Sequence, residues 1–447
     1  MFIFIYIVKK LKVLAMTIHV VQAGDTIESI ANKYKVPVNR LIRENGIINP
    51  NNLVIGQTIV IAYPSETYEV KEGDTLESIA KEKQITMMQL YRNNPVLFDR
   101  DYIIPGETLV ISYDTQATIT TNAYAYPFID RRILRNAMPY LTYLSILNYK
   151  TMKGGEIESF YDDSELIQLA KEAGVIPVML LTSLTILGEK NPEIVYDILI
   201  NTQFQDRHAQ NMANIMKEKG YSGINITITY LNSSNQDLYI SYLRRITSYL
   251  RKEGFIIFIT IDPNVVSIEN QSIFENVDYT EYSELVDEIY LMKFLWGTKY
   301  EPPGPVSSIK TITAYLDYML ESVTPSVVNI GFPLLGYDWR LPYILGYTQA
   351  NAVTLESAIE LAILTESIIS FDDKSKTPHF EYSMETDARI NRNIVWFVDA
   401  RALYEIVKLV IEKKLSGTGL WYIMNYYPQL WLIIVSNCKI ERLLPEP

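Results

Sequence analysis

Residues 220–232 read GYSGINITITYLN, and this stretch decides the fold. Residues 223–229 are rich in β-branched Ile and Thr, with glycines before them and an Asn-Ser-Ser-Asn run after them, which predicts a short strand. Successive side chains of a strand point to opposite faces, so one face is apolar and one polar. The apolar face holds Ile224, Ile226 and Ile228, and the polar face holds Asn225, Thr227 and Thr229. In a parallel α/β barrel the polar face would point inward, and Thr229 would lie where active sites are built.

The chain from residue 117 onward alternates strand-like and helix-like segments, the pattern of a parallel sheet or barrel. The candidate strands are residues 119–124, 143–147, 175–181, 223–229, 255–261, 288–293, 327–332 and 417–424. The sequence therefore predicts an α/β fold, a TIM (β/α)8 barrel over residues 117–447. A small α+β insertion is expected at about residues 335–392.

Two repeats precede the barrel. Residues 16–63 (repeat 1) and 66–113 (repeat 2) share the pattern G-D-T-[IL]-x-S-I-A and a later G-[QE]-T-[IL]-V-I. In each repeat a strand is followed by a G-D-T turn, in which Asp or Thr can cap the helix that carries the next apolar residues. A second helix and a closing strand complete a β-α-α-β unit. We expect two small domains of the same fold.

Composition narrows the possible partners. The chain has 447 residues, a net charge of −12 and 48% hydrophobic residues, so we expect a large core and neither nucleic acid nor an anionic membrane as partner. The 33 tyrosines suit a neutral ligand that stacks on aromatic rings. Cys438 is the single cysteine, which excludes an intramolecular disulfide. His19, His208 and His379 show no ligand spacing, and we expect neither a metal nor a cofactor.

Residues 1–15, MFIFIYIVKKLKVLA, are apolar first and basic afterwards, the reverse of a secretory signal, and the apolar run is too short to span a bilayer. We interpret them as an N-terminal extension, with Met16 as an alternative start. No other segment has the uninterrupted apolar length of a membrane span.

Both repeats resemble LysM domains over their whole length. The resemblance implies that they bind a glycan containing N-acetylglucosamine, between the loop after the first strand and the loop before the last. The implied contact residues are Gly24, Asp25, Thr26, Ile27, Asn49 and Asn51 in repeat 1, and Gly73, Asp74, Thr75 and Leu76 in repeat 2, together with the loop at 98–103. The alternative is that the G-D-T residues only cap a helix.

The strand at 223–229 resembles the signature of glycoside hydrolase family 18, the chitinase-like barrels. The family pattern D-G-x-D-x-D-x-E falls on Ser222, Gly223, Asn225, Thr227 and Thr229, so only the glycine is kept. In that family the terminal Glu protonates the glycosidic oxygen while the substrate acetamide attacks, and the preceding Asp orients the acetamide. Both positions are threonine here.

Further segments resemble the spore cortex-lytic branch, in which two LysM domains precede a family 18 barrel. They include residues 331–343 (GFPLLGYDWRLPY) and 417–434 (GTGLWYIMNYYPQLWLII). In this branch a tyrosine and an acid stand where this chain has Phe294 and Leu295. The resemblance implies that Trp421 floors a sugar subsite and that Tyr337, Asp338, Trp339 and Trp296 contribute to glycan binding. Core packing is the alternative for Trp421 and Trp296.

Two functions of different classes follow from these resemblances. The first is a catalytically silent barrel that binds peptidoglycan or another N-acetylglucosamine polymer in the spore envelope, near spore coat proteins, after synthesis in the mother cell without a secretion signal. The second is an active N-acetylglucosaminidase of cortex fragments. For the second, Asp262 after the strand at 255–261 is the alternative acid, with Asp338 and Glu301 as further carboxylates that could face the mouth. The absence of carboxylates at Thr227 and Thr229 favours the first.

Overall fold

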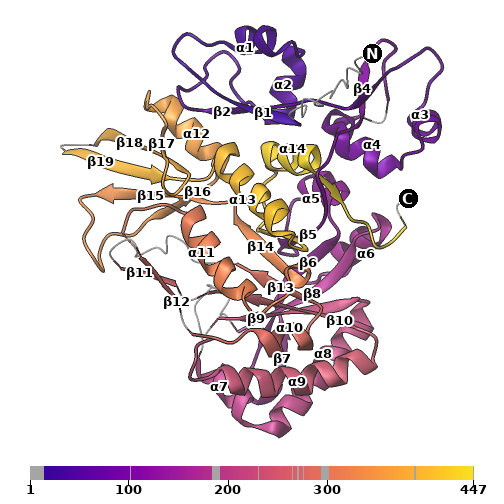
Figure 1. The fold of residues 1–447 in the computed structure, drawn as a ribbon, viewed down its shortest axis with the longest axis vertical. Coiled ribbons are helices and arrows are strands. Elements are labelled where there is room, and N and C mark those ends of the chain that lie inside the picture. Colours follow the sequence, from indigo (N-terminus) through magenta and orange to yellow (C-terminus); the bar gives the residue numbers. More distant parts are fainter. Residues whose placement is uncertain are drawn as a thin grey trace, which may run out of the picture.

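The computed structural model describes residues 15–100, 102–183, 192–229, 231–263, 265–268, 271–274, 276–292, 302–386 and 389–445. These residues form the two N-terminal repeats, a central barrel and an insertion beside the barrel (Figure 1). Repeat 1 lies above the insertion and helix α14 in this view, and repeat 2 lies beside it.

Both repeats have the predicted β-α-α-β order. Repeat 1 consists of β1 (Met16–Val20), α1 (Ile27–Tyr34), α2 (Val38–Asn45) and β2 (Thr58–Ala62), and repeat 2 of β3 (Glu66–Glu69), α3 (Leu76–Lys83), α4 (Met87–Asn93), the 3-10 helix η1 (Pro95–Asp99) and β4 (Thr108–Ser112). The two strands of each repeat pair antiparallel. Thr26 and Thr75 cap α1 and α3 through reciprocal bonds with the serine three residues later. Capping explains why the Thr of G-D-T precedes both helices.

Eight parallel strands close the barrel in the order β5-β6-β8-β9-β10-β13-β14-β20, and β20 pairs with β5. They are β5 (Ala117–Ala125), β6 (Tyr143–Thr151), β8 (Ile176–Thr182), β9 (Gly223–Ile228), β10 (Ile256–Ile261), β13 (Glu288–Leu291), β14 (Val328–Pro333) and β20 (Gly417–Trp421). Two short strands extend the sheet: β7 (Ile157–Ser159) pairs with β6, and β21 (Cys438–Ile440) with β5. The predicted barrel is confirmed.

Helices surround the strands. They are α5 (Arg131–Ala137), α6 (Ser164–Glu172), α7 (Pro192–Ile200), α8 (Thr202–Lys219), α9 (Gln236–Lys252), α10 (Thr280–Leu285), α11 (Ile309–Leu320), α13 (Ala400–Lys413) and α14 (Pro428–Asn437), with 3-10 turns η2 (Met138–Tyr140), η3 (Lys153–Gly155) and η4 (Pro325–Val327). A hairpin, β11 (Val265–Ile268) and β12 (Gln271–Phe274), follows β10. Gly220 ends α8 with a left-handed φ of 82°, a conformation that suits glycine, and thereby turns the chain into β9.

Two apolar clusters lie inside the barrel. The cluster towards the N-terminal strand ends contains Tyr143, Ile176, Val178, Phe258 and Tyr290. The cluster towards the C-terminal ends, which form the mouth, contains Tyr124, Leu147, Leu180 and Met292, with Trp421 packed against it. The isoleucines of β9 instead join the outer core with the helices, as its alternation predicts.

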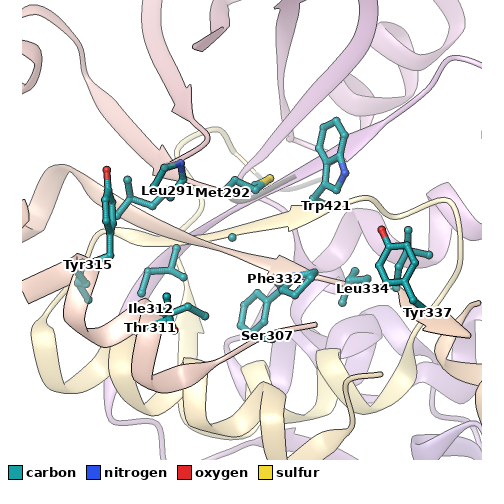
Figure 2. Close-up of a pocket in the computed structure, with 16 residues that line it drawn as sticks. Leu291, Met292, Ser307, Thr311, Ile312, Tyr315, Phe332, Leu334, Tyr337 and Trp421 are labelled. Carbon is teal, nitrogen blue, oxygen red and sulfur yellow. The ribbon is translucent and has the colours of Figure 1, made fainter. Parts of the chain in front are cut away.

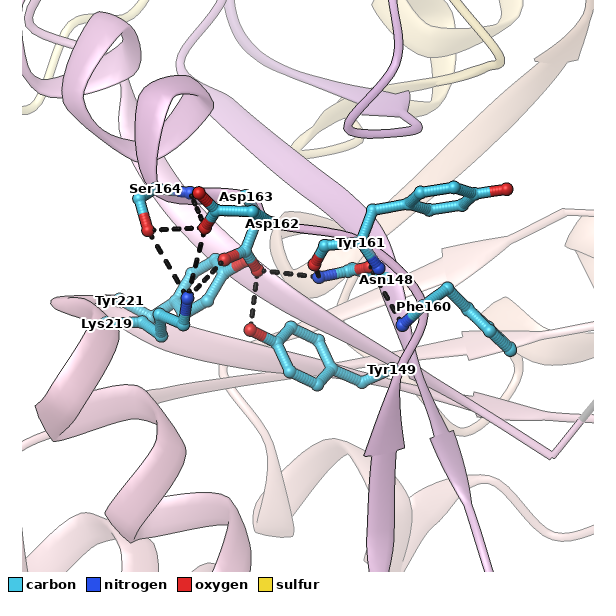
Figure 3. A network of polar contacts seen from close by, with 9 residues as sticks. All are labelled: Asn148, Tyr149, Phe160, Tyr161, Asp162, Asp163, Ser164, Lys219 and Tyr221. Carbon is cyan, nitrogen blue, oxygen red and sulfur yellow. Dashed lines mark hydrogen bonds and ion pairs between the residues drawn. The ribbon is translucent and has the colours of Figure 1, made fainter.

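A buried carboxylate connects β6 with the neighbouring helices on the outside of the barrel (Figure 3). Asp163, which is fully buried, accepts hydrogen bonds at one oxygen from the hydroxyls of Tyr149 (2.5 Å) and Tyr221 (2.6 Å) and from the amide of Asn148 (3.0 Å). Lys219 at the end of α8 lies 3.4 Å from its other oxygen. The network joins β6, α6 and α8, so this carboxylate has a structural role away from the mouth.

The insertion lies between β14 and α13. It is an antiparallel sheet in the order β16-β15-β19-β18-β17, covered by one helix. Its elements are β15 (Gly336–Leu341), β16 (Asn351–Val353), α12 (Leu355–Leu364), β17 (Ser370–Asp372), β18 (Thr377–Thr386) and β19 (Arg389–Trp396).

Repeat 1 is packed against the barrel and the insertion. The side-chain amide of Gln429, on α14, donates to Asn45 (3.1 Å) and to the carbonyl of Thr58 (2.7 Å). Arg401, on α13, donates to the carbonyl of Gly56 and lies over the ring of Phe371 in the insertion, 4.0 Å from its centroid. Arg401 therefore connects three parts of the molecule.

Repeat 2 contacts the barrel through an aromatic side chain. Phe98 of η1 meets Tyr140 and Tyr426 edge to face, with ring centroids 6.2 and 6.5 Å apart. Val110 and Tyr113 near the end of repeat 2 also join the main hydrophobic core. Phe98 thus faces the barrel, whereas the sequence placed it in the glycan groove of repeat 2.

Candidate functional site

The polar side chains of β9 lie inside the barrel in a neutral network. Asn225 is fully buried; its amide donates to the hydroxyl of Tyr124 (3.0 Å) and its oxygen accepts from the hydroxyl of Thr260 (2.7 Å). The Tyr124 and Thr260 hydroxyls are themselves 2.9 Å apart. Each group is therefore a neutral hydrogen-bonding partner of the others, and burial raises the pKa of Tyr124, which keeps its phenol protonated.

Thr227 and Thr229 follow nearer the mouth. The Thr227 hydroxyl donates to the carbonyl of Leu181 (3.2 Å), and the Thr229 hydroxyl lies 3.4 Å from that of Ser183. Both threonines are nearly buried, with exposures of 8% and 6%. At the positions where the resemblance implies an orienting Asp and a general acid, the chain thus has hydroxyl groups, which do not protonate a leaving group near neutral pH.

Trp421 ends β20 at the mouth. Its ring is half-buried and meets Tyr124 edge to face, with centroids 5.4 Å apart, and the peptide bond that follows it is cis. Because Tyr124 in turn bonds Asn225, one column of side chains runs from the mouth to the centre of the barrel. Trp421 is thus neither fully buried nor fully exposed, and its contact with a sugar stays a prediction.

An apolar cavity of about 60 Å³ lies beside Trp421, between β13, β14 and α11 (Figure 2). Its wall includes Met292, Phe332 and Tyr315, with Trp421 and Tyr337 at the side of β20 and β15. The volume is well below the ~150 Å³ in which an apolar cavity holds a benzene-sized ring. It is too small for a sugar ring, so a glycan at the mouth would lie across Trp421 and not in this cavity.

The alternative acid, Asp262, directly follows β10, the neighbour of β9. It is 9% exposed, and its backbone N–H donates to the carbonyl of Ile228 (3.2 Å). Tyr315, which lines the apolar cavity, is close enough to interact with Asp262. Burial is the main cause that raises the pKa of Tyr315, and the charge of Asp262 raises it further. Asp262 thus lies near the mouth and on the side of the cavity. Phe294, Leu295, Trp296 and Glu301 lie outside the described residues.

The side chains of the Tyr337-Asp338-Trp339 segment point alternately to the two faces of β15, so they have different surroundings. Tyr337 is half-buried and lines the apolar cavity. Asp338 accepts hydrogen bonds from Tyr382 (2.7 Å) and Asn393 (2.9 Å) within the insertion sheet, and Trp339 is fully buried. Trp339 presents no ring face to a ligand, which corrects its sequence-based assignment, and the Asp338 carboxylate is engaged with the insertion sheet.

The loops implied as glycan sites are alike in the two repeats. Gly24, Thr26, Gly73 and Thr75 are exposed, as are Asn49 and Asn51, whereas Ile27 and Leu76 are buried in the cores of their repeats. Asp25 accepts from the backbone N–H of Gln22 (2.7 Å), which lowers its pKa, and pairs with His19 (3.0 Å). Asp74 accepts from Lys71 N–H (2.7 Å) and from Tyr68 in the same manner. Both aspartates brace the loop, and glycan binding there stays a prediction.

Among the described residues, no cluster of His, Cys, Asp and Glu has the form of a metal site. Within the same residues, none of the helices has the length and apolarity needed to cross a bilayer.

Comparison with known proteins identifies the family to which this architecture belongs. The sequence model described as "Glycosyl hydrolases family 18" matches residues 178–425, more than half of the chain. The chain belongs to glycosyl hydrolase family 18. The LysM domain model matches residues 19–62 and 68–112, the two repeats.

Relatives of this family 18 chain match nearly its whole length. A cortical fragment-lytic enzyme of Bacillus subtilis is 32% identical over 96% of this chain and 99% of that protein. The corresponding enzyme of Bacillus anthracis is 29% identical over 94% and 98%. The crystal structure of the spore cortex-lytic enzyme SleL from Bacillus megaterium superposes with a TM-score of 0.77 at 28% identity, covering 96% of this chain and all of that one.

Sequence reasoning missed two residues inside the barrel that lie between the mouth and Asn225. Tyr124 and Thr260 connect Trp421 to Asn225, yet neither belongs to the signature. The signal for Tyr124 was the alternation of β5, which places Thr120, Asn122 and Tyr124 on one face. Only the closed barrel shows that this face meets β9.

Proposed function

We propose that the protein binds a glycan containing N-acetylglucosamine, peptidoglycan or a chitin-like polymer, through its LysM domains and the mouth of a family 18 barrel that does not hydrolyse it. The observation that carries the proposal is the neutral network on β9. Asn225, Thr227 and Thr229 occupy the positions of three acidic residues in the family pattern, and their partners are hydroxyl and carbonyl groups.

The chemistry explains why this substitution matters. Hydrolysis by this family needs an acid for the leaving oxygen and a partner that holds the acetamide for attack. Thr229 supplies no acid and Thr227 no carboxylate, and loss of a positioned acid alone lowers the rate by roughly 10²–10⁴. Glycan binding needs neither group, since apolar ring faces and hydrogen bonds are sufficient. The half-buried ring of Trp421 fits such a role.

The names of the relatives support a location for the proposed glycan binding. The proteins of similar length are named for lysis of the spore cortex or its fragments. We therefore assign the protein to the spore envelope, at the boundary of cortex and coat, with peptidoglycan as its glycan and coat proteins as neighbours. The net charge of −12 suits a strand of neutral sugar rings better than a densely anionic polymer such as nucleic acid.

The test is incubation of the purified full chain with spore cortex fragments and with N-acetylglucosamine oligomers. Sedimentation with the insoluble glycan should show binding, and mass analysis of the supernatant should show no new product. Binding should survive moderate salt because it does not rest on ion pairs. Retention that moderate salt abolishes would instead indicate adsorption by charge.

The second candidate function is hydrolysis with a relocated acid. It is favoured by the position of Asp262, nearly buried at the end of the strand next to β9, and by the enzyme names of the relatives. Product release by the wild type that Thr229→Ala leaves unchanged and Asp262→Asn abolishes would replace the first proposal with this one.

A further inference from the structure

A crevice of about 170 Å³ separates LysM domain 1 from the insertion and the barrel. One wall is the loop after α2, including Ile48 and Asn49; the opposite wall is α12, including Ile359 and Ile363; and Tyr427 with neighbouring residues before α14 closes the end. The space slightly exceeds the ~150 Å³ that holds a six-membered ring in an apolar cavity. It therefore has room for the ring of one sugar residue, whose substituents would extend through the open side, whereas the cavity beside Trp421 is smaller than this benchmark.

The floor of the crevice is the docking contact between LysM domain 1 and the rest of the molecule. The Gln429 amide joins Asn45 to the carbonyl of Thr58, and both Asn45 and Gln429 are 7% exposed. A Cβ placed on Gly46 would lie 2.8 Å from Pro428, and one on Gly56 would lie 2.0 Å from the carbonyl oxygen of Ile369. Glycine at these two positions therefore allows LysM domain 1 to pack closely against Pro428 and Ile369 at the floor of the crevice.

The lining chemistry selects a neutral ligand. Apolar and aromatic faces alternate with amides, the combination that binds sugars by stacking and hydrogen bonds. Two carboxylates, Glu356 and Asp399, also line the crevice, whereas none of its lining residues in the described part of the chain is Lys, Arg or His. Asp399 is paired with Arg401 (2.7 Å), so the exposed carboxylate of Glu356 is the charge that disfavours a carboxylate or phosphate group on the ligand.

The crevice is continuous with the implied glycan groove of LysM domain 1. Asn49 belongs to both: the resemblance places it in the groove, and it lines the crevice. Ile48 beside it is 51% exposed, an apolar surface at the junction. A glycan strand leaving the groove past Asn49 would enter the crevice without bending away from the protein surface.

We propose that the crevice between LysM domain 1 and helix α12 is a glycan subsite that holds one uncharged N-acetylhexosamine residue of a strand bound in the LysM groove. This inference rests on the proposed glycan binding. It adds that the insertion of the barrel, and not the LysM domain alone, contacts the strand, and that the strand must be long enough to reach it. Sugar residues with a free carboxylate are disfavoured at this position.

The test uses the full chain with the trimer and the hexamer of N-acetylglucosamine. Ile363→Trp fills the crevice, whereas Leu364→Trp, the next residue of α12, adds the same side chain at a position that is 80% exposed and does not line it. Calorimetry should show that Ile363→Trp weakens hexamer affinity by roughly fivefold or more and leaves trimer affinity unchanged. Leu364→Trp should change neither. Equal hexamer affinity for wild type and a folded Ile363→Trp would overturn the subsite.

Hydrogen exchange on the wild type provides a second readout that needs no variant. The hexamer should protect the amides of α12 as well as the LysM loops, and the trimer only the loops. Protection of the loops at residues 23–27 with α12 unchanged would refute the subsite while leaving glycan binding intact. No protection and no heat with either oligomer would instead refute the proposed function itself.

Discussion

At the N-terminal end of its strands the barrel buries a carboxylate, whereas the inward positions of β9 towards the mouth hold an amide and hydroxyls. Glu288, the first residue of β13, is 9% exposed and accepts hydrogen bonds from Asn329 (2.6 Å) and Ser416 (2.9 Å). Asn225 on β9 is fully buried, and its partners are hydroxyls that also bond each other. The fold therefore accommodates a buried acid where two donors meet it, whereas the described partners of Asn225 form a neutral network.

The largest effect is expected from restoring the acidic residues at the mouth. A variant with Asn225→Asp, Thr227→Asp, Thr229→Glu and Phe294→Tyr should release product from N-acetylglucosamine oligomers, weakly and with retained anomeric configuration, where the wild type releases none. Thr229→Glu alone should do little, because residues that act as a unit are not additive. Mass analysis and NMR of the anomers are the measurements. A folded fourfold variant without product would show that the mouth lacks more than its acids.

The second prediction places one charge in the neutral network. Asn225→Asp keeps the hydrogen bond accepted from Thr260 but loses the donor to Tyr124, and it buries an ionised group. We expect a loss of about 2–4 kcal/mol in the free energy of unfolding at pH 8. The loss should shrink at pH 5, where a buried carboxyl can take up a proton. Urea denaturation at both pH values measures the free energy of unfolding. An Asn225→Asp protein as stable as the wild type at pH 8 would show that the network on β9 tolerates a charge as well as the site of Glu288 does.

The third prediction concerns the buried carboxyl of Glu288. Burial raises the pKa of Glu288 from 4.5 to about 7, while Asn329 and Ser416 lower it in part. The folded state holds this proton more tightly than the unfolded state, so the stability contribution is full below pH 4.5 and is lost as the pH rises to about 7. The shift corresponds to about 3 kcal/mol.

Glu288→Gln should therefore raise the free energy of unfolding at pH 8 by up to about 3 kcal/mol and leave it nearly unchanged at pH 4. The amide retains an acceptor for Asn329 and gains a donor for Ser416. Glu284→Gln, an exposed residue nearby, removes the same charge and serves as the control. A Glu288→Gln protein that gains nothing at pH 8 relative to this control would show that the acid is fully compensated.

The sequence predicts the β9 side of this contrast, because the two faces of that strand follow from local alternation. The strand at 223–229 was assigned from β-branched residues, and its two faces lie as the alternation requires. The repeats were recognisable because their G-D-T turns specify a helix cap within four residues. Such signals depend on neighbouring residues and survive without knowledge of the fold.

The remaining features depend on segments far apart in the chain. The burial of Trp339 and the partners of Asp338 follow from the pairing of β15 with β19, which no local pattern specifies. Gly56 and Gly106 hold the same place in the repeats, yet only Gly56 meets Ile369, so the docking of LysM domain 1 could not be inferred from either copy. The crevice is a product of that docking and was likewise absent from the sequence-based site.

The smallest expected effect tests whether the mouth still binds sugar after losing its acids. Trp421→Ala removes the half-buried ring above Tyr124, and with it an aromatic face worth roughly 1 kcal/mol, or about a fivefold loss in affinity for an oligosaccharide at the mouth. Trp396→Ala, which removes another half-buried ring, stacked on His379 in the insertion, is the matched control and should leave affinity unchanged. Thermal melting must first show that both variants are folded, since a buried Trp→Ala costs about 3–5 kcal/mol. If Trp421→Ala is folded and binds as the wild type does, Trp421 is a packing residue, and the mouth has lost its ligand together with its acids. The LysM grooves and the crevice beside α12 would then carry the proposed glycan binding alone.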